Sequence, residues 1–210
     1  MCWQCRQPQT GCYCGLVDPF ESGCDFVILI HPRENRRRIA TGRMAHRLLK
    51  DSYLFEGEVF DDHPGIARLL EDPKRECLIL YPDRDALDVD ASSDEELRLF
   101  SDGKKRPTIF LIDGTWATAK RTMRLSSQLQ GLAKLKFSPQ TLSRFQMVRK
   151  QPAPECLSTI EAIHELLERL NTRIENRKAH ASKREHDRLL SVFVQMVERQ
   201  ASFNPASLRV

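Results

Sequence analysis

Three short runs of apolar residues most constrain what this chain can fold into. They occupy residues 26–30, 77–81 and 108–112, and polar residues or proline bound each of them. Continuous apolar runs of this length are typical of strands covered on both faces, as in a parallel sheet. A shorter run at 135–137 is a fourth strand candidate, whereas the polar segment 83–96 is predicted to be a loop.

Segments with helical spacing alternate with these runs. Residues 41–50 carry apolar side chains three and four positions apart, with Thr41 as the expected N-cap. A second helix is expected over 116–129, directly after the third run. Ser158, with Glu161 three residues later, predicts a capping box that opens a helix ending near residue 170. This alternation predicts an α/β domain of three layers around a mostly parallel sheet.

Polar motifs follow the ends of the apolar runs. His31 and Pro32 follow the first run, Pro82 follows the second directly after Tyr81, and Asp113 follows the third. Ligands of parallel sheets bind beyond the carboxyl ends of the strands. We therefore expect these motifs to meet in one crevice, together with the start of the helix capped by Ser158.

The domain organisation follows from the same patterns. We expect an N-terminal zinc-binding segment at 1–24, one catalytic domain at 25–200 that includes a last amphipathic helix around 189–197, and a loose tail at 201–210. No apolar run reaches the roughly 20 residues that span a bilayer, and the N-terminus lacks a secretion signal. The expected compartment is the reducing cytoplasm, where stable disulfides are uncommon.

Four cysteines lie close together near the N-terminus, at positions 2, 5, 12 and 14. Cys2, Cys5, Cys12 and Cys14 would supply four thiolates to one structural zinc ion, with no open coordination position. The alternative is a set of free thiols or a disordered start of the chain. Cys24, Cys77 and Cys156 are more typical of small buried apolar residues, and Cys77 lies inside a predicted strand.

The charge of the chain is modest but unevenly distributed. Lys and Arg number 33 against 29 acidic residues, which gives a net charge of +4. The basic residues gather in separate clusters that would favour a polyanionic partner if they met on one face. On charge alone, an ordinary solvated surface is an equally good interpretation.

The segment that follows the third run is the candidate chemical centre. Asp113 would lie at a strand end, Gly114 allows a tight turn, Thr115 could cap the next helix, and Trp116 offers a face for stacking. From spacing alone, an Asp or Thr before a helix is more often a simple cap than a catalytic group.

The residues 113–116, Asp-Gly-Thr-Trp, resemble the Asp-x-Thr-Trp signature of the DTW-domain family of tRNA-uridine aminocarboxypropyltransferases. Other segments match the family's motifs in the same order. They are the His31–Glu34 stretch with the arginine-rich loop and Thr41-Gly42 behind it, then Leu80-Tyr81-Pro82, then residues 157–162, while the leading cysteines are similar to those of bacterial members. The resemblance covers about residues 2–170.

The resemblance implies a fold and a reaction. The fold would be similar to SPOUT methyltransferases, with a C-terminal knot. The donor would be S-adenosylmethionine, whose 3-amino-3-carboxypropyl group passes to the imide nitrogen of a tRNA uridine in the variable loop, at position 47, and methylthioadenosine leaves. The partners would be tRNA and this small donor, with no membrane, and a monomer is the favoured oligomeric state.

The resemblance also assigns candidate site residues. Asp113, Thr115 and Trp116 would be catalytic, with Asp113 either the base for the uridine imide or a group that positions it. Trp116 would stack on a base or anchor its own helix. The donor pocket would be formed by Thr41, Gly42, Tyr81, Pro82, Leu157, Ser158 and Thr159. The candidates for gripping tRNA phosphates are Arg33, Arg36, Arg37, Arg38, Lys120, Arg121, Arg124, Arg144, Arg149 and Lys150.

Two competing interpretations remain open at the level of sequence. One is a SPOUT-like RNA methyltransferase that transfers a different carbon of the same donor. The other is a non-catalytic RNA-binding module built around a zinc knuckle. Strand-end motifs that converge on a carboxylate favour an enzyme, because a simple binding module has no need of them.

Overall fold

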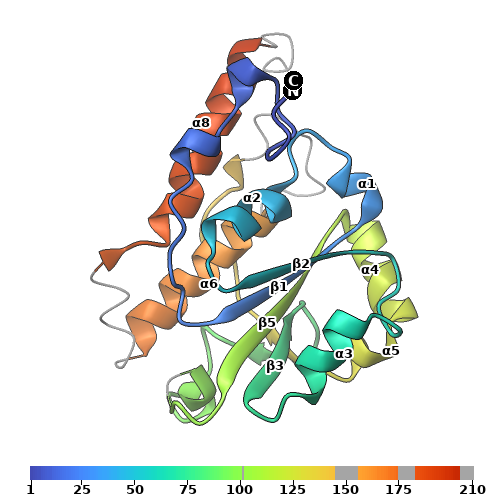
Figure 1. The fold of residues 1–210 in the computed structure, drawn as a ribbon. Helices are drawn as coiled ribbons and strands as arrows, with labels where there is room; N and C mark the ends of the chain where they lie inside the picture. The colour runs from blue at the N-terminus through green and yellow to red at the C-terminus, as the bar shows by residue number, and fades with distance from the viewer. Residues whose placement is uncertain (101, 145–155, 175–182, 204–210) are drawn as a thin grey trace.

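A computed structural model describes residues 1–100, 102–144, 156–174 and 183–203 (Figure 1). Its centre is one sheet of six strands in the order β2-β1-β5-β3-β6-β4. All the pairings between these strands are parallel. The strands are β1 Asp25–Ile30, β2 Ser52–Glu56, β3 Arg75–Leu80, β4 Leu87–Asp88, β5 Arg106–Asp113 and β6 Ala133–Lys136.

The central strands are covered on both faces, as their continuous apolar sequences predict. Every residue of β1 is buried. Phe26 and Ile28 belong to one core cluster, whereas Val27 and Leu29 belong to the other. Because side chains of a strand alternate between faces, the two clusters lie on opposite sides of the sheet.

Helices form the outer two layers (Figure 1). On one face lie α2 Thr41–Leu48, α6 Thr159–Arg173 and α8 Asp187–Phe203, whose apolar residues share the larger core. On the other lie α3 Pro64–Glu71, α4 Trp116–Leu125 and α5 Ser127–Gln130. The remaining helical segments are short: α1 Pro32–Asn35, η1 Gln9–Gly11, η2 Cys14–Leu16 and η3 Glu96–Phe100. The predicted three-layer α/β architecture is confirmed. None of the helices in the described ranges is long and apolar enough to cross a membrane.

Several local expectations are wrong. The segment 83–96 is not all loop, because it contains β4 and the first residue of η3. The helix expected over 116–129 is broken at Ser126, whose hydroxyl accepts the Phe60 N–H at 3.1 Å. Asp61 then accepts the N–H groups of Ser127 and Gln128 and so starts a new helix, α5. Distant residues therefore set this break, and the local sequence gives no sign of it.

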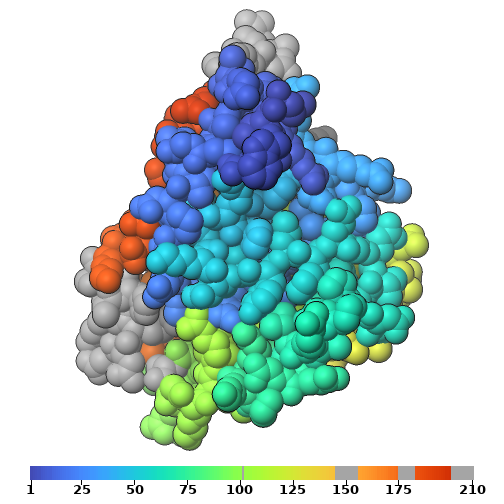
Figure 2. Space-filling model, viewed as in Figure 1, coloured from blue at the N-terminus to red at the C-terminus, as the bar shows by residue number. Residues whose placement is uncertain are grey.

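The N-terminal segment packs against the rest of the molecule. Cys5, Tyr13, Phe20 and Cys24 are buried within the larger core, beside residues of α2, α6 and α8. Figure 2 shows the first residues of the chain, in the darkest blue, standing on the outside of the molecule. The segment therefore combines a buried inner side with an exposed outer side.

Candidate functional site

Asp113 joins three segments that are far apart in the sequence. It is the last residue of β5, and its side chain is buried, with 7% exposed. Its Oδ2 accepts the backbone N–H of Gly42 at 3.1 Å, and its Oδ1 accepts the hydroxyl of Thr159 at 2.7 Å. The carboxylate therefore connects the start of α2 to the start of α6.

Asp113 serves as the missing cap of α2. Thr41, the expected N-cap, is instead the first residue of that helix, and the cap position holds Ala40, which has no side-chain acceptor. The unpaired N–H groups at a helix start need an acceptor. Asp113 supplies one from another strand, and its negative charge lies at the positive end of the helix dipole.

Gly42 permits this contact because it has no side chain. A Cβ atom at position 42 would lie 2.5 Å from Oδ2 of Asp113 and 2.8 Å from Cγ2 of Ile28. Both distances are too short for any real side chain. Glycine is therefore required here for close approach to the carboxylate, not for an unusual backbone angle.

His31 lies directly beside Asp113 at the neighbouring strand end. Its N–H donates to the Asp113 carbonyl at 3.0 Å, which continues the β1–β5 pairing. Its Nδ1 accepts the N–H of Arg33 and so caps α1, and its Nε2 lies 3.3 Å from a carboxylate oxygen of Glu58. The stretch that opens the first motif thus leaves the sheet at the Asp113 site.

Thr115 and Trp116 begin α4 on the other side of Asp113. Thr115 is the N-cap, and its hydroxyl accepts the N–H of Thr118 at 3.2 Å. Trp116 is 39% exposed, and its indole N–H donates to the sulfur of Cys156 at 3.2 Å. The interpretation of Trp116 as a buried anchor for its helix is therefore wrong.

The predicted capping box at the start of α6 is confirmed. Ser158 is the N-cap, and its N–H and hydroxyl both donate to the Glu161 carboxylate, at 2.8 and 2.6 Å. The same carboxylate also accepts the Ser143 hydroxyl and the Arg144 N–H. Glu161 thus fixes the entry to α6 and holds Thr159 where it reaches Asp113. Leu157, which precedes the cap, is half-buried.

Tyr81 and Pro82 follow β3, the strand next to β5. They lie at the same edge of the sheet as Asp113, as the parallel arrangement requires. The Tyr81 N–H donates to the Leu135 carbonyl at 2.9 Å, and burial raises the pKa of its phenol. Pro82 is exposed.

A buried arginine that the sequence patterns did not single out binds the basic loop, residues 31–40. Arg43 of α2 is 6% exposed and donates to the backbone carbonyls of Asn35, Arg37 and Arg38. Burial lowers the pKa of Arg43. Arg43 thus binds the backbone of the loop, while the side chains of Arg36, Arg37 and Arg38 are exposed.

The candidate phosphate-binding residues lie mostly on the surface. All of those that the structure describes are exposed: Arg33, Arg36, Arg37, Arg38, Lys120, Arg121, Arg124 and Arg144. One of them, Arg37, pairs with Glu34 at 3.2 Å, and Arg121 lies 3.9 Å from Glu58. Arg149 and Lys150 lie outside the described residues.

Comparison with known proteins assigns the family. The DTW domain matches residues 1–201 of this chain. The chain belongs to the DTW domain family. It is 34% identical over 185 residues to "tRNA-uridine aminocarboxypropyltransferase 2" of Drosophila melanogaster, a match over 84% of this chain and 69% of that protein. It is 30% identical over 165 residues to the protein of the same name in Mus musculus, over 76% of this chain and 53% of the relative. The chain thus spans about half the length of the mouse protein. No solved structure matches.

In this DTW domain the four N-terminal cysteines lie within reach of one metal ion. The sulfur atoms of Cys2, Cys5, Cys12 and Cys14 all lie within 4.8 Å of one another. Cys2 and Cys14 are 3.6 Å apart and Cys5 and Cys12 are 3.7 Å apart. A tetrahedral zinc ion with bonds of about 2.3 Å separates its sulfurs by about 3.8 Å. The donors and their spacing therefore fit a structural zinc ion.

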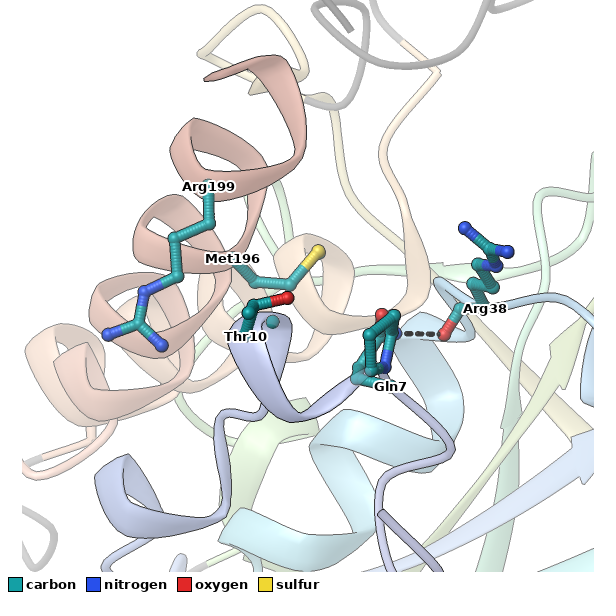
Figure 3. A pocket seen from close by; sticks show the side chains of 7 residues that line it. Gln7, Thr10, Arg38, Met196 and Arg199 are labelled. Atoms are coloured by element: carbon teal, nitrogen blue, oxygen red, sulfur yellow. Dashed lines mark hydrogen bonds between the residues drawn. The ribbon is translucent and has the colours of Figure 1, made fainter. Parts of the chain in front are cut away.

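The cysteine segment, residues 1–24, is tied to the basic loop of the DTW domain. Arg6 donates to the Asn35 carbonyl at 3.1 Å, and Gln7 donates to the Arg38 carbonyl at 2.5 Å. Figure 3 shows Gln7 and Arg38 beside Met196 and Arg199 of α8, around a cavity of about 220 Å³. None of the residues around Asp113 lines this cavity, so it is separate from the Asp113 site.

Trp3 is the second feature of the DTW domain that the sequence patterns did not single out. It lies between Cys2 and Cys5 and is 85% exposed. Arg47 donates to the neighbouring Gln4 at 3.1 Å and to the sulfur of Cys14 at 3.2 Å. A large exposed indole is uncommon on a protein surface, and its position inside a Cys-x2-Cys pair is the signal that could have identified it.

Proposed function

We propose that this chain is a tRNA-uridine aminocarboxypropyltransferase that uses S-adenosylmethionine as donor. The observation that carries the proposal is the double hydrogen bond at Asp113, from the Gly42 N–H and from the Thr159 hydroxyl. It brings the first, third and last motifs of the DTW domain to one buried carboxylate. The names of the relatives support the reaction and the tRNA substrate.

The reaction needs a proton acceptor and a leaving group. The imide N–H of a uridine must lose its proton, and the nitrogen then attacks the carbon of the aminocarboxypropyl chain that is bonded to the sulfonium. The new N–C bond forms as the C–S bond breaks, and the sulfur keeps the electron pair as methylthioadenosine leaves. Holding the reacting atoms in line can contribute up to about 7–11 kcal/mol to such a step.

Asp113 is the proposed group for the imide. An ionised carboxylate only accepts hydrogen bonds, and both oxygens of Asp113 do so here. The donors at Gly42 and Thr159 hold the carboxylate in one orientation, and this supports a positioning role for the uridine imide at least as well as a role as base.

The donor pocket is proposed at the carboxyl edge of the sheet, around the same carboxylate. Thr41, Gly42, Tyr81, Pro82, Leu157, Ser158 and Thr159 would form it. Thr115 would set the start of α4, and the exposed Trp116 would stack on a base. Stacking on an exposed aromatic ring suits a uridine that has left its own stacked context.

The tRNA would bind across the basic loop and the cysteine segment. The exposed arginines at 33 and 36–38, joined by Lys120, Arg121, Arg124 and Arg144, supply positive charge next to the Asp113 site. Trp3 would stack on an unpaired base, as aromatic residues do in many RNA-binding modules. Structural zinc on the four cysteines would hold this surface in shape, and the proposed location is the cytoplasm.

The SPOUT-like assignment and the C-terminal knot belong to the same proposal. The all-parallel sheet supports the assignment. The segment 145–155, which leads into α6, lies outside the described residues, so the knot stays a prediction. The division into residues 1–24, 25–200 and 201–210 also stays a proposal.

The decisive experiment is nucleoside analysis of tRNA after incubation with the protein and S-adenosylmethionine. We expect a uridine heavier by one aminocarboxypropyl group, with an equal amount of methylthioadenosine. Asp113→Asn should abolish both, and because it also removes the charge that caps α2, circular dichroism is used to check that the variant is still folded. A product heavier by one methyl group would assign the methyltransferase alternative instead. Binding of tRNA without turnover, unchanged in Asp113→Asn, would assign the binding module.

A further inference from the structure

A second group of metal-binding side chains lies between α6 and α8, away from Asp113. His164 and Glu168 lie one turn apart on α6, and His186 and Asp187 lie where α8 begins. One ligand atom from each of the four residues lies within 4.8 Å of the other three. Neither the DTW motifs nor the proposed reaction uses these side chains.

The contacts within the group are short and involve the ligand-type atoms. His164 Nε2 lies 3.0 Å from Oδ1 of Asp187, and His186 Nε2 lies 2.5 Å from Oε2 of Glu168. His186 Nε2 is also 3.8 Å from Oδ1 of Asp187. A tetrahedral zinc ion bound through nitrogen and oxygen separates its ligand atoms by about 3.3 Å. The observed distances lie on both sides of that value, so small side-chain rotations would complete the geometry.

The two histidines are buried and face each other. They are 9% and 2% exposed, and their ring centres are 5.0 Å apart. Two buried imidazoles beside two carboxylates form a donor set that suits Zn²⁺ among nitrogen and oxygen ligands.

Arg184 holds the carboxylates from outside. It donates to Oδ2 of Asp187 at 2.7 Å and to Oε1 of Glu168 at 3.1 Å. The oxygens nearest the histidines are Oδ1 of Asp187 and Oε2 of Glu168. Oδ1 of Asp187 also accepts a hydrogen bond from Arg184 at 3.0 Å. Such outer contacts orient the carboxylates of metal sites. Arg184 has φ of 44°, a strained value for a residue with a side chain, which its role in positioning the carboxylates would explain.

We propose that His164, Glu168, His186 and Asp187 form a second metal site, specific for a divalent transition metal of the Zn²⁺ class. It differs from the cysteine site in its ligands, two nitrogens and two oxygens instead of four thiolates. The metal fastens the start of α8 to α6. Farther along α8, Arg199 donates to the Cys12 carbonyl at 3.1 Å, so this helix links the second site to the cysteine segment.

The site is tested by counting metal ions in the full chain. The protein is stripped of metal with a chelator and titrated with Zn²⁺, and we expect two bound equivalents, one for each site. Cobalt substitution should distinguish them, because only the cysteine site gives strong sulfur-to-metal charge-transfer absorption. Saturation at one equivalent, with that absorption, would show that the cluster is a network of ion pairs only.

Two variants assign the second equivalent to these residues. His186→Gln removes one ligand, and Glu168→Gln removes the charge of another while keeping its size. Since even outer-shell partners change metal affinity by about 10–100-fold, each variant should weaken the second equivalent by more than about 100-fold. Lys183→Gln is the matched control, because it changes an exposed charge beside the cluster without removing a ligand. A second equivalent that keeps its affinity in both variants, with metal-free folding confirmed by circular dichroism, would overturn the proposal.

Discussion

The Oδ2 atom of Asp113 accepts the N–H of Gly42 at 3.1 Å, and a methyl group on residue 42 would lie 2.5 Å from that same oxygen. Two motifs 71 residues apart are thus fitted to each other with no space between them. At this point the backbone of α2 is in direct contact with the carboxylate of Asp113. This contact makes the position of Asp113 sensitive to changes on α2, a helix that carries no catalytic group of its own.

Gly42→Ala should displace Asp113. The added methyl group must push the carboxylate or Ile28 aside, and such overpacking costs about 1–3 kcal/mol of stability. We expect aminocarboxypropyl transfer to fall by far more than binding of tRNA does. Gly15→Ala is the control, because a Cβ at Gly15 meets nothing within 4 Å. Equal activities of the two variants would contradict this account.

Thr159→Val removes the hydroxyl that donates to Asp113 and keeps the shape of the side chain. A hydrogen bond to a charged group contributes roughly 1.5–3 kcal/mol, so we expect lower stability and a lower kcat. Thr159→Ser restores the hydroxyl and should recover most of both. The measurement pairs single-turnover transfer with urea unfolding. If Val and Ser behave alike, the hydroxyl does not position Asp113.

Removal of the proposed zinc ion should loosen the basic loop. Cys5 is fully buried, and the adjoining Arg6 and Gln7 donate to the carbonyls of Asn35 and Arg38. Cys5→Ser should lose one zinc equivalent, lower the Tm and raise amide hydrogen exchange at residues 35–38. Cys77→Ser, inside β3, changes a cysteine without touching the proposed ligands and should keep the full metal content.

His46 should make the protein less stable in mild acid. Burial, aided by the charge of Arg47, lowers the pKa of His46 from its ordinary 6.5. The unfolded chain therefore binds a proton at a higher pH than the folded one, and stability falls as the pH drops below about 6.5. Urea unfolding of the parent and of His46→Gln at pH 8 and pH 5.5 measures this. The loss between the two pH values should be smaller in the variant.

The salt dependence of tRNA binding should distinguish arginines that contact phosphates from a tryptophan that stacks on a base. Arg36→Gln and Arg38→Gln should each reduce the slope of log K against log salt by roughly 0.9 or less, because each removes about one phosphate contact. Trp3→Ala should weaken binding by about 1–3 kcal/mol and leave that slope unchanged. Lys74→Gln is the control, because Lys74 directly precedes β3 and so lies at the amino ends of the strands, away from Asp113. A Trp3 variant that binds like the parent would remove the stacking role.

The core strands were predictable because a continuous run of apolar residues indicates a strand that is buried on both faces. Residues 26–30 and 108–112 are apolar on both faces, and a strand between two helical layers needs nothing else. The strand β2 was missed because it lies at the sheet edge, where its residues are only partly buried and its sequence does not form a continuous apolar run. The break of the helix at Ser126 was missed because its causes, Phe60 and Asp61, are 66 positions away.

The meeting of the motif residues at one end of the sheet was predictable, but the hydrogen bonds that connect them were not. Ser158 and Glu161 form a capping box whose spacing alone is sufficient to identify it. Thr41 seemed the natural cap of its helix, since threonine is favoured there, yet the acceptor comes from Asp113 on another strand. No local pattern reports an acceptor supplied from such a distance. The same is true of Arg43, whose three carbonyl partners belong to a loop that the helix merely follows.

The partners of Asp113 also fix when the site can exist. Gly42 comes 71 residues before it and Thr159 comes 46 residues after it. On a translating ribosome, Asp113 and Gly42 emerge well before Thr159, so the nascent chain displays the carboxylate before its second donor has been synthesised. Under the proposed function, we therefore expect aligned transfer only after the C-terminal helices, beginning with α6, have been added.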